Sequence, residues 1–354
     1  MEDCHVAPLC DCYTASMATL YGIVIFALAG MLLYYAGEML VSGLLRLSRF
    51  YRIKEFIVAF FVMAFAGTLP NFFVGITSAL QGIPELSFGD VMGNNIVALT
   101  LAVALALFIS PHKKLPLGSS TVQYTTFMTA CAALLPLILI SDGTLSRSDG
   151  LVLVLFFIIY VAWLFSREDS FSKIYEEDQQ APPARGRQEA LSASVKVVAG
   201  LTLLAIAAQA VVYGAELIAL ALGVPLMVVG VLVVGFGGAL PELYFTVVTA
   251  RKGETDMILG NLMGAVISPA TLVLGIVAMI HPIQNENLEF PLLGRLFLAF
   301  VAMYFLYASY TSKTISMREG YALLAVYILF LVAMVLSLGI VDYVPPALAH
   351  FGLL

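Results

Sequence analysis

Two prolines stand in the middle of long apolar stretches of this 354-residue sequence. Pro70 lies in FAGTLPNFF (65–73), and Pro241 lies in FGGALPELY (236–244), directly before Glu242. A proline inside a helix removes one backbone N–H donor and crowds the preceding turn. We therefore predict that Pro70 and Pro241 each interrupt the helix that contains them.

Each interruption should leave one backbone carbonyl without its helical partner. Counting four residues back, these carbonyls belong to Ala66 and Gly237. At membrane depth a free carbonyl is tolerated only where protein or water surrounds it, and its oxygen suits a hard cation. The alternative is a simple packing kink, since Gly and Pro are frequent in membrane helices. Two such sites at matched positions favour an ion site.

Polar side chains recur at helical spacing around these prolines. Thr68 and Asn71 are three residues apart, and Asp90 and Asn94 are four apart, so each pair shares one face of a helix. A carboxylate in a bilayer core costs at least about 2.5 kcal/mol and usually faces a cavity. We therefore predict that Glu242 binds a cation or a proton.

The charge of the predicted site indicates which cation it suits. Glu242 alone supplies one negative charge, which balances Na⁺ or H⁺ and leaves Ca²⁺ under-compensated. Glu242 together with Asp90 supplies two charges, enough for a divalent metal ion with help from amide and carbonyl oxygens. Asp90 could instead only cap the N-terminal end of its helix, and the sequence leaves both roles open.

The elements that must position these residues are membrane helices. The chain is 61% hydrophobic and 11% charged, with a mean hydropathy of +0.99, whereas soluble domains carry about 25% charged residues. Stretches of about 20 apolar residues predict membrane-spanning helices. The sequence therefore predicts an all-α polytopic protein in a lipid bilayer, with ten spans at 18–45, 54–82, 88–110, 122–141, 149–166, 193–222, 225–251, 256–281, 292–311 and 319–342.

Basic residues set the predicted orientation. Fifteen of the seventeen lie in loops on one side of the predicted membrane, and only Arg147 and Arg295 lie on the other. Because basic loops favour the cytoplasmic side, we expect both termini to be extracytoplasmic. The polar segment 167–192 then forms a cytoplasmic linker between a first five-helix repeat (1–166) and a second (193–354).

Two motifs recur in both halves at identical spacing. FAGTLPNFF (65–73) matches FGGALPELY (236–244), and FGDVMGNNI (88–96) matches LGNLMGAVI (259–267). In each half the proline lies nineteen positions before the first glycine of the second motif. The first copy is predicted to run outward and the second inward, so the halves have inverted topology. Inverted repeats with broken helices near the midplane are typical of secondary transporters.

These motifs resemble the α-repeats of the cation/calcium exchanger superfamily, the sodium/calcium exchangers and their relatives. The family's repeats read approximately G-T-S-L-P-E followed by G-N-x-x-G-S-N-I. The resemblance places α-repeats at about 60–108 and 231–279 and covers nearly the whole chain. It implies ten helices, ion sites between the α-repeats, and antiport of cytoplasmic Ca²⁺ against Na⁺ or H⁺. We expect small inorganic cations as substrates and no cofactor.

Several ligand positions depart from the family pattern. Asn71 replaces the acidic residue after the first proline, whereas Glu242 keeps it in the second repeat. Our hypothesis is that the charge lost at Asn71 has partly moved to Asp90. Oxygen-bearing side chains are absent at Ala98, Ala239, Ala265 and Pro269, so the family's stoichiometry is not carried over. The predicted ion-binding set comprises Ala66, Thr68, Asn71, Asp90, Asn94, Gly237, Glu242 and Asn261.

Three functions fit this sequence. The first is exchange of Ca²⁺ for Na⁺ or H⁺, and the second is proton-coupled exchange of another cation. The third is a transport-silent relative acting as a membrane sensor or scaffold, which the lost ligands favour and Glu242 and Asp90 oppose. The sequence has no HExxH motif, nucleophile elbow or P-loop and no basic nucleic-acid patch, so we expect neither an enzyme nor a nucleic-acid partner.

Two smaller groups of residues stand outside the α-repeats. Glu38 and Glu216 lie in the similar contexts YYAGEML and VYGAELI. They either line a pathway or hold loop amides, and the structural role is favoured. Cys4, Cys10 and Cys12 crowd the N-terminus, but their spacing fits no standard zinc pattern.

Overall fold

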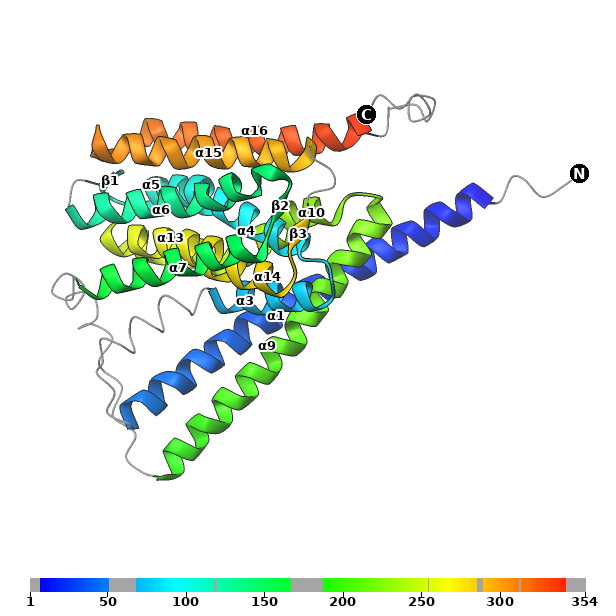
Figure 1. Ribbon diagram of the computed structural model, residues 1–354, viewed down its shortest axis with the longest axis horizontal. Coiled ribbons are helices and arrows are strands. Elements are labelled where there is room, and N and C mark those ends of the chain that lie inside the picture. The colour runs from blue at the N-terminus through cyan, green and yellow to red at the C-terminus, as the bar shows by residue number, and fades with distance from the viewer. Residues whose placement is uncertain are drawn as a thin grey trace, which may run out of the picture.

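The computed structural model describes residues 7–50, 68–117, 120–166, 187–253, 255–284, 289–311 and 313–341. Within these ranges almost every element is a helix (Figure 1). The first half contains α1 (Ala7–Phe50), α3 (Thr68–Leu80), α4 (Glu85–Val97), the π-helix η1 (Ala98–Ala102), α5 (Val103–Ile109), β1 (Lys114–Pro116), α6 (Ser120–Leu139), the 3₁₀ helix η2 (Ile140–Asp142), β2 (Thr144–Leu145) and α7 (Arg147–Phe165).

From its π-helix η5 onward, the second half has an order of elements similar to that of the first half from η1 onward. It contains α9 (Arg187–Leu222), α10 (Leu226–Val229), the π-helix η4 (Gly230–Val234), α11 (Gly235–Gly238), α12 (Leu240–Lys252), α13 (Thr255–Ser268), the π-helix η5 (Pro269–Val273), α14 (Leu274–Ile280), β3 (Ile283–Gln284), α15 (Glu289–Tyr310), β4 (Thr314–Ser316) and α16 (Met317–Val341). The π-helices η1 and η5 begin 171 residues apart, at Ala98 and Pro269, and α5 and α14 are separated by the same offset.

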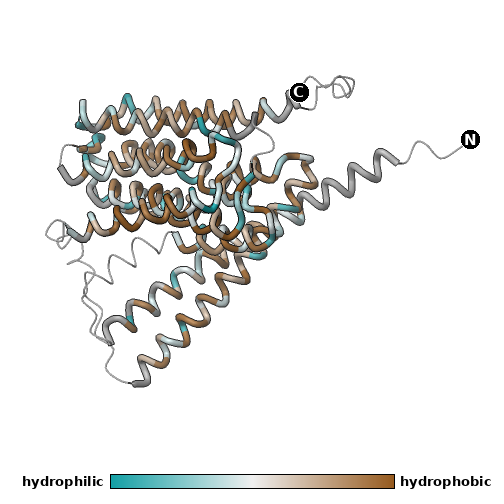
Figure 2. The backbone as a smooth tube through the Cα atoms, in the orientation of Figure 1, coloured by the Kyte–Doolittle hydropathy of each residue, from teal (hydrophilic) through white to brown (hydrophobic). Residues whose placement is uncertain are grey.

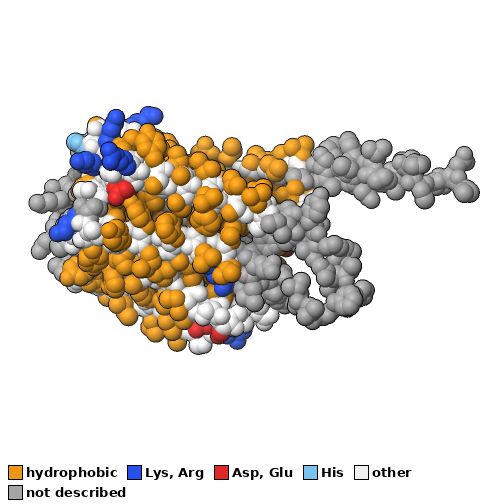
Figure 3. Space-filling view, turned by 90° about the horizontal axis from the view of Figure 1, so that it is seen from above, with side chains coloured by type: hydrophobic (Ala, Val, Ile, Leu, Met, Phe, Trp, Pro, Cys, Tyr) orange, Lys and Arg blue, Asp and Glu red, His pale blue; other side chains and the backbone are white. Residues whose placement is uncertain are grey.

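The described helices make this an integral multi-pass membrane protein. Eight of them are long and apolar enough to cross a membrane, and Thr68–Leu80 and Leu292–Ala308 are two shorter apolar helices. Apolar side chains cover the middle of the face in Figure 3, and Lys and Arg gather mainly at its left end. The predicted all-α membrane fold is confirmed. Part of the predicted span 54–82, with Ala66, lies outside the described residues.

The described helices pack around two large hydrophobic cores and a third, smaller cluster between α6, α7 and α13. Helices α1 and α9 run antiparallel, because Gly22 of α1 lies against Ile218 while Gly43 lies against Val197. Small residues at such crossings let helix backbones approach closely. This pair shares a core with α3 and η4, and it lies across one side of the remaining helices in Figures 1 and 2. The larger core joins α4 and α5 to α6 and α12–α16.

Short strand pairs join the two halves beyond the helices. Strand β1 pairs antiparallel with β4, and β2 pairs antiparallel with β3. The N–H of Leu117 also donates to the carbonyl oxygen of Lys313 at 2.7 Å. Each pair links a loop of one half to a loop of the other, so the halves are connected at two separate loop sites.

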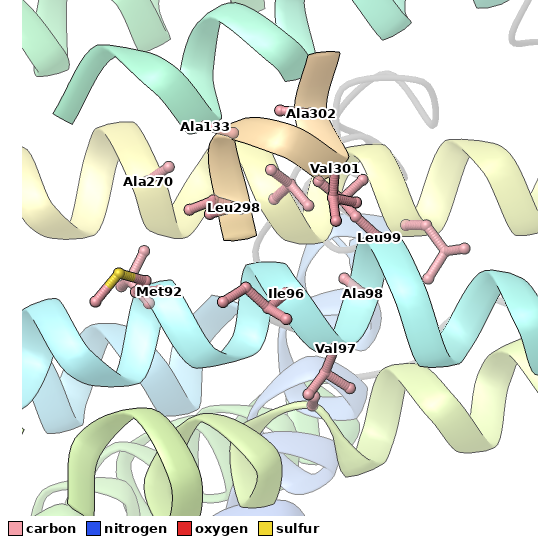
Figure 4. Packing of buried hydrophobic residues seen from close by; sticks show 14 of the residues in the cluster. Met92, Ile96, Val97, Ala98, Leu99, Ala133, Ala270, Leu298, Val301 and Ala302 are labelled. Atoms are coloured by element: carbon pink, nitrogen blue, oxygen red, sulfur yellow. The ribbon is translucent and has the colours of Figure 1, made fainter. Parts of the chain in front are cut away.

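Helix α4 is the most enclosed element of the site region. Every residue from Leu86 to Val97 is buried. One side of α4 packs against α15 through Met92, and Ile96 belongs to the same apolar cluster as Leu298 and Val301 (Figure 4). The polar residues of α4 therefore have no route to bulk solvent along this side.

Candidate functional site

Glycines bring α4 of the first half against the backbone of the second half. A Cβ atom at Gly93 would lie 2.1 Å from the carbonyl oxygen of Val231 in η4. A Cβ atom at Gly235 in α11 would lie 2.7 Å from the carbonyl oxygen of Asp90. These distances are shorter than real Cβ contacts allow, so larger residues would push the halves apart. The glycines thereby set the separation of α4 from η4 and α11.

The helix of the second half is interrupted next to Pro241. Helix α11 ends at Gly238, Ala239 follows with φ −79° and ψ −9°, and α12 starts at Leu240. Pro241 is thus the second residue of α12, where its missing N–H needs no helical acceptor. Glu242 lies in the first turn of α12, and the dipole there favours a negative charge.

Two predicted ligands of the first half converge on this interruption. A Cβ atom at Gly238 would lie 2.9 Å from Oδ1 of Asn71 and 3.4 Å from Oδ1 of Asp90. Only glycine at position 238 therefore leaves room for these two oxygens where they now lie. Asn71 comes from α3 and Asp90 from α4, so three elements meet at this point.

Both predicted carboxylates are buried, and three of their four oxygens lack a hydrogen-bond partner in the described residues. Asp90 is fully buried and Glu242 is 5% exposed. Within the described part of the chain, both carboxylate oxygens of Asp90 and Oε2 of Glu242 lack a hydrogen-bond partner. The two groups also interact electrostatically with each other. Buried carboxylates need a countercharge or a proton, so this arrangement can hold a cation.

The capping role considered for Asp90 does not fit its position. Asp90 is the sixth residue of α4, and Pro84 precedes the helix without a side-chain cap. Dipole effects fall off within the first turn. Asp90 therefore lies inside the molecule as an unpaired acid and not at a helix end.

Asn94 bridges the two repeats. Its Nδ2 donates to the carbonyl oxygen of Ala265 in α13 at 3.2 Å, across 171 residues of sequence. The same offset relates the two α-repeats, so equivalent positions of both halves touch here. The Oδ1 of Asn94 is buried without a partner in the described residues and is one turn from Asp90, which makes it available to a cation.

The other predicted residues are less closely grouped. Thr68 is buried at the start of α3. Asn261 is half-buried in α13, with an Nδ2 that has no partner among the described residues. Gly237 faces α1, because a Cβ atom there would lie 3.2 Å from the ring of Phe26. Ala66 lies outside the described residues.

Three buried polar groups extend the site beyond the predicted set. Within the described residues, Ser87 Oγ, Asn95 Oδ1 and Thr246 Oγ1 have no hydrogen-bond partner. Ser87 lies one turn before Asp90 and faces α3, where a Cβ atom at Gly75 would be 2.9 Å from its hydroxyl. Thr246 lies one turn after Glu242. Helical spacing places Ser87 and Thr246 on the same faces as the two carboxylates, but it does not show that their hydroxyls lack partners.

Thr246 is unusual among the threonines of these helices. A helical threonine commonly donates its hydroxyl to the carbonyl four residues earlier. Hydroxyls that do so belong to Thr100, Thr126, Thr129, Thr202, Thr249 and Thr271. Thr246 is fully buried and does not, so its oxygen remains available for another ligand.

Among the described residues no group of three or more His, Cys, Asp or Glu side chains could hold a metal ion. The site instead combines two carboxylates with amide and hydroxyl oxygens. Hard cations such as Ca²⁺ accept ligands of this kind, whereas a transition-metal centre would call for nitrogen or sulfur donors.

Known proteins resemble this chain over most of its length. The family described as sodium/calcium exchanger protein matches residues 21–166 and 193–336. An uncharacterized membrane protein of Methanocaldococcus jannaschii is 28% identical over 304 residues, which cover 86% of this chain and 95% of the relative. The sodium/calcium exchanger MaX1 of Methanosarcina acetivorans is 32% identical over 113 residues, 32% of each chain.

A solved structure has the same fold. The sodium-calcium exchanger NCX_Mj, soaked with Na⁺ and Sr²⁺, superposes with a TM-score of 0.57 and 25% sequence identity. The match covers 89% of this chain and 98% of NCX_Mj. The match therefore includes residues of both halves of this chain.

Proposed function

This chain belongs to the sodium/calcium exchanger protein family, and from that premise we propose that it is a secondary-active cation antiporter. It exchanges Ca²⁺ for Na⁺ or H⁺ by alternating access. The relatives MaX1 and NCX_Mj are named as sodium/calcium exchangers, which supports this class of activity. The proposal places the transported cation between α4 and the α11–α12 interruption.

One observation carries the proposal. Asp90 and Glu242 come from different halves, interact electrostatically, and are buried with oxygens that lack hydrogen-bond partners in the described residues. Together they supply two negative charges, which match one divalent cation. Asn71 and Asn94 add amide oxygens nearby, and Gly238 leaves the space that an ion would need.

The fold supports alternating access. In the proposed architecture, ten helices form two five-helix repeats of inverted topology, with both termini outside and the linker 167–192 in the cytoplasm. The constant offset of 171 residues between matching elements supports this arrangement. Helices α1 and α9 share a core separate from the larger one, so they could slide as a pair and expose the site to each side in turn.

Flux through reconstituted protein tests this function. An outward Na⁺ or H⁺ gradient across proteoliposomes should drive ⁴⁵Ca²⁺ uptake, and Glu242→Gln should abolish it. Asp142→Asn is the matched control, because Asp142 is an exposed acid that accepts a hydrogen bond from the N–H of Thr144 in a loop. Equal uptake by wild type and Glu242→Gln would refute the site.

The transport-silent alternative has one observation in its favour. Ala239 and Ala265 place methyl groups where the family pattern has serine, and the structure buries both. Absence of flux for every cation tested, with a folded protein, would favour that alternative. Flux of a different cation driven by a pH gradient would favour a proton-coupled exchanger of that cation.

A further inference from the structure

A third carboxylate lies on α1, outside the site described above. Glu38 is exposed, although the segment Leu20–Leu44 is apolar enough to cross a membrane. A carboxylate in contact with lipid at membrane depth costs at least about 2.5 kcal/mol, and such residues usually face water or protein. The position of Glu38 therefore needs a reason other than packing.

A hydrogen bond from Tyr34 holds the Glu38 carboxylate in place. The hydroxyl of Tyr34 donates to Oε1 of Glu38 at 2.7 Å, one helical turn away. This is the only side-chain hydrogen bond that Glu38 makes within the described residues, and no basic side chain there pairs with it. The role of holding loop amides, favoured from the sequence, is thus not what the described residues show. The second carboxylate oxygen of Glu38 is therefore left for another ligand.

The face of α1 that carries Glu38 is turned toward α12. The opposite face of α1, which includes Leu33, Ala36 and Leu40, is buried in the core shared with α9. Tyr34 interacts electrostatically with Tyr244 of α12, and Tyr244 is two residues beyond Glu242. Tyr34 is 37% exposed and Tyr244 is 66% exposed, so both tyrosines reach the surface of the molecule on this side of α1.

We infer that Glu38, held by Tyr34, is an access subsite that captures a hydrated divalent cation on its way to or from Asp90 and Glu242. This inference rests on the proposed antiport function. The carboxylate raises the local cation concentration beside α12, as a charge at the mouth of a cleft does. The basic end of α1 beyond Glu38 makes this the cytoplasmic approach in the proposed orientation.

Glu216 on α9 offers the matching test on the other side. Because Gly22 lies against Ile218 in the antiparallel pair, Glu216 is level with the start of the apolar part of α1. Sixteen residues of helix separate Gly22 from Glu38, a distance of about 24 Å along the axis. The two acids therefore lie near opposite faces of the membrane, and each should act only on its own side.

The first experiment measures side-specific affinity. In proteoliposomes of known orientation, Glu38→Gln should raise the Ca²⁺ concentration for half-maximal rate about fivefold on the cytoplasmic side, with the maximal rate retained. Glu216→Gln should do so on the other side, and Glu38→Asp should restore wild-type values. A structural role would instead lower the maximal rate or change both sides equally, and that result would overturn the inference.

The second experiment does not depend on transport. In a background of Asp90→Asn and Glu242→Gln, tyrosine-sensitised Tb³⁺ luminescence of the purified protein reports binding near Tyr34. Adding Glu38→Gln should remove this emission, and Tyr34→Phe should reduce it. Emission unchanged by Glu38→Gln would contradict the subsite even if exchange is observed. Loss of emission without any Ca²⁺ flux would retain the subsite and reject the antiport function.

Discussion

The two α-repeats fold alike but carry their polar groups differently. In the first, Asn71 follows the proline and Asp90 lies in the next helix, whereas the second has Glu242 and Asn261 at the equivalent positions. Each repeat thus keeps one carboxylate and one amide, in reverse order. At these two positions the repeats therefore carry equal charge, which lies after the proline in the second repeat and in the next helix in the first.

The repeats also differ in how many oxygens they offer. Buried polar residues in the first include Thr68, Asn71, Ser87, Asp90, Asn94 and Asn95. The equivalents in the second, 171 residues later, include Ala239, Ile258, Ala265 and Val266. Thr246 reverses the pattern, since its equivalent is Gly75. The first repeat therefore has more buried neutral polar groups than the second, and we predict that Glu242 and Thr246 are the main contribution of the second.

The largest effect is expected from removing the negative charge of Asp90. Asp90→Asn leaves Glu242 alone with a divalent cation, and losing one partner of a buried charge pair costs about 3–5 kcal/mol. Ca²⁺ exchange in proteoliposomes should therefore fall by at least about 100-fold. Exchange by Asp90→Asn at the rate of wild type would mean that Asp90 is not a ligand.

The second repeat has the acid after the proline and the amide in the next helix. Giving the first repeat the same order should restore the Ca²⁺ exchange that Asp90→Asn loses. The double variant Asn71→Glu with Asp90→Asn returns an acid to the position after the proline and keeps the total charge. Because both oxygens point at Gly238, Ca²⁺ exchange should return to within about tenfold of wild type. The single variant Asn71→Glu is the control. If the single and the double variant both fail to exchange Ca²⁺, the charge reversal is contradicted.

Filling the space at the interruption should have a smaller effect. Gly238→Ala places a methyl group 2.9 Å from Oδ1 of Asn71, and overpacking of this kind costs about 1–3 kcal/mol. Apparent Ca²⁺ affinity should fall about tenfold because the side chain of Asn71 has to move, and the overpacking should also lower thermal stability in detergent. Gly30→Ala in α1 is the matched control, because a Cβ atom at Gly30 would meet no atom within 4 Å.

The smallest effect is expected at Thr246. Thr246→Val keeps the shape of the side chain and removes the unpartnered hydroxyl, whose net contribution would be about 0.5–1.5 kcal/mol. Ca²⁺ affinity should fall about threefold. Thr249→Val is the matched comparison, since the hydroxyl of Thr249 already donates to the carbonyl of Phe245 at 2.8 Å. Equal effects at both positions would remove Thr246 from the site.

Much of this fold could be predicted from the sequence because a stretch of about 20 apolar residues indicates a membrane helix. The matched prolines predicted the interruption beside Glu242, and the repeated motifs predicted which segments are equivalent. Helix ends were harder to place. Helix α1 covers Ala7–Phe50 and α9 starts at Arg187, beyond the apolar stretches 18–45 and 193–222, because hydropathy marks the membrane and not the end of a helix.

Other features had no signal in a single sequence. A π-helix inserts one residue per turn without a characteristic residue type, so η1 and η5 were not foreseen. Strand pairs of two or three residues, such as β2 with β3, depend on which loops meet in space. The hydroxyl of Thr246 could not be singled out either, because a helical threonine normally bonds to its own backbone.

The central claim is that Asp90 and Glu242, one from each repeat, hold a single divalent cation. Calorimetric titration of Ca²⁺ into the purified protein tests it most directly. Wild type should bind Ca²⁺, while Asp90→Asn and Glu242→Gln should each weaken binding by at least about 100-fold. Binding of Ca²⁺ by both variants with the affinity of wild type would contradict it.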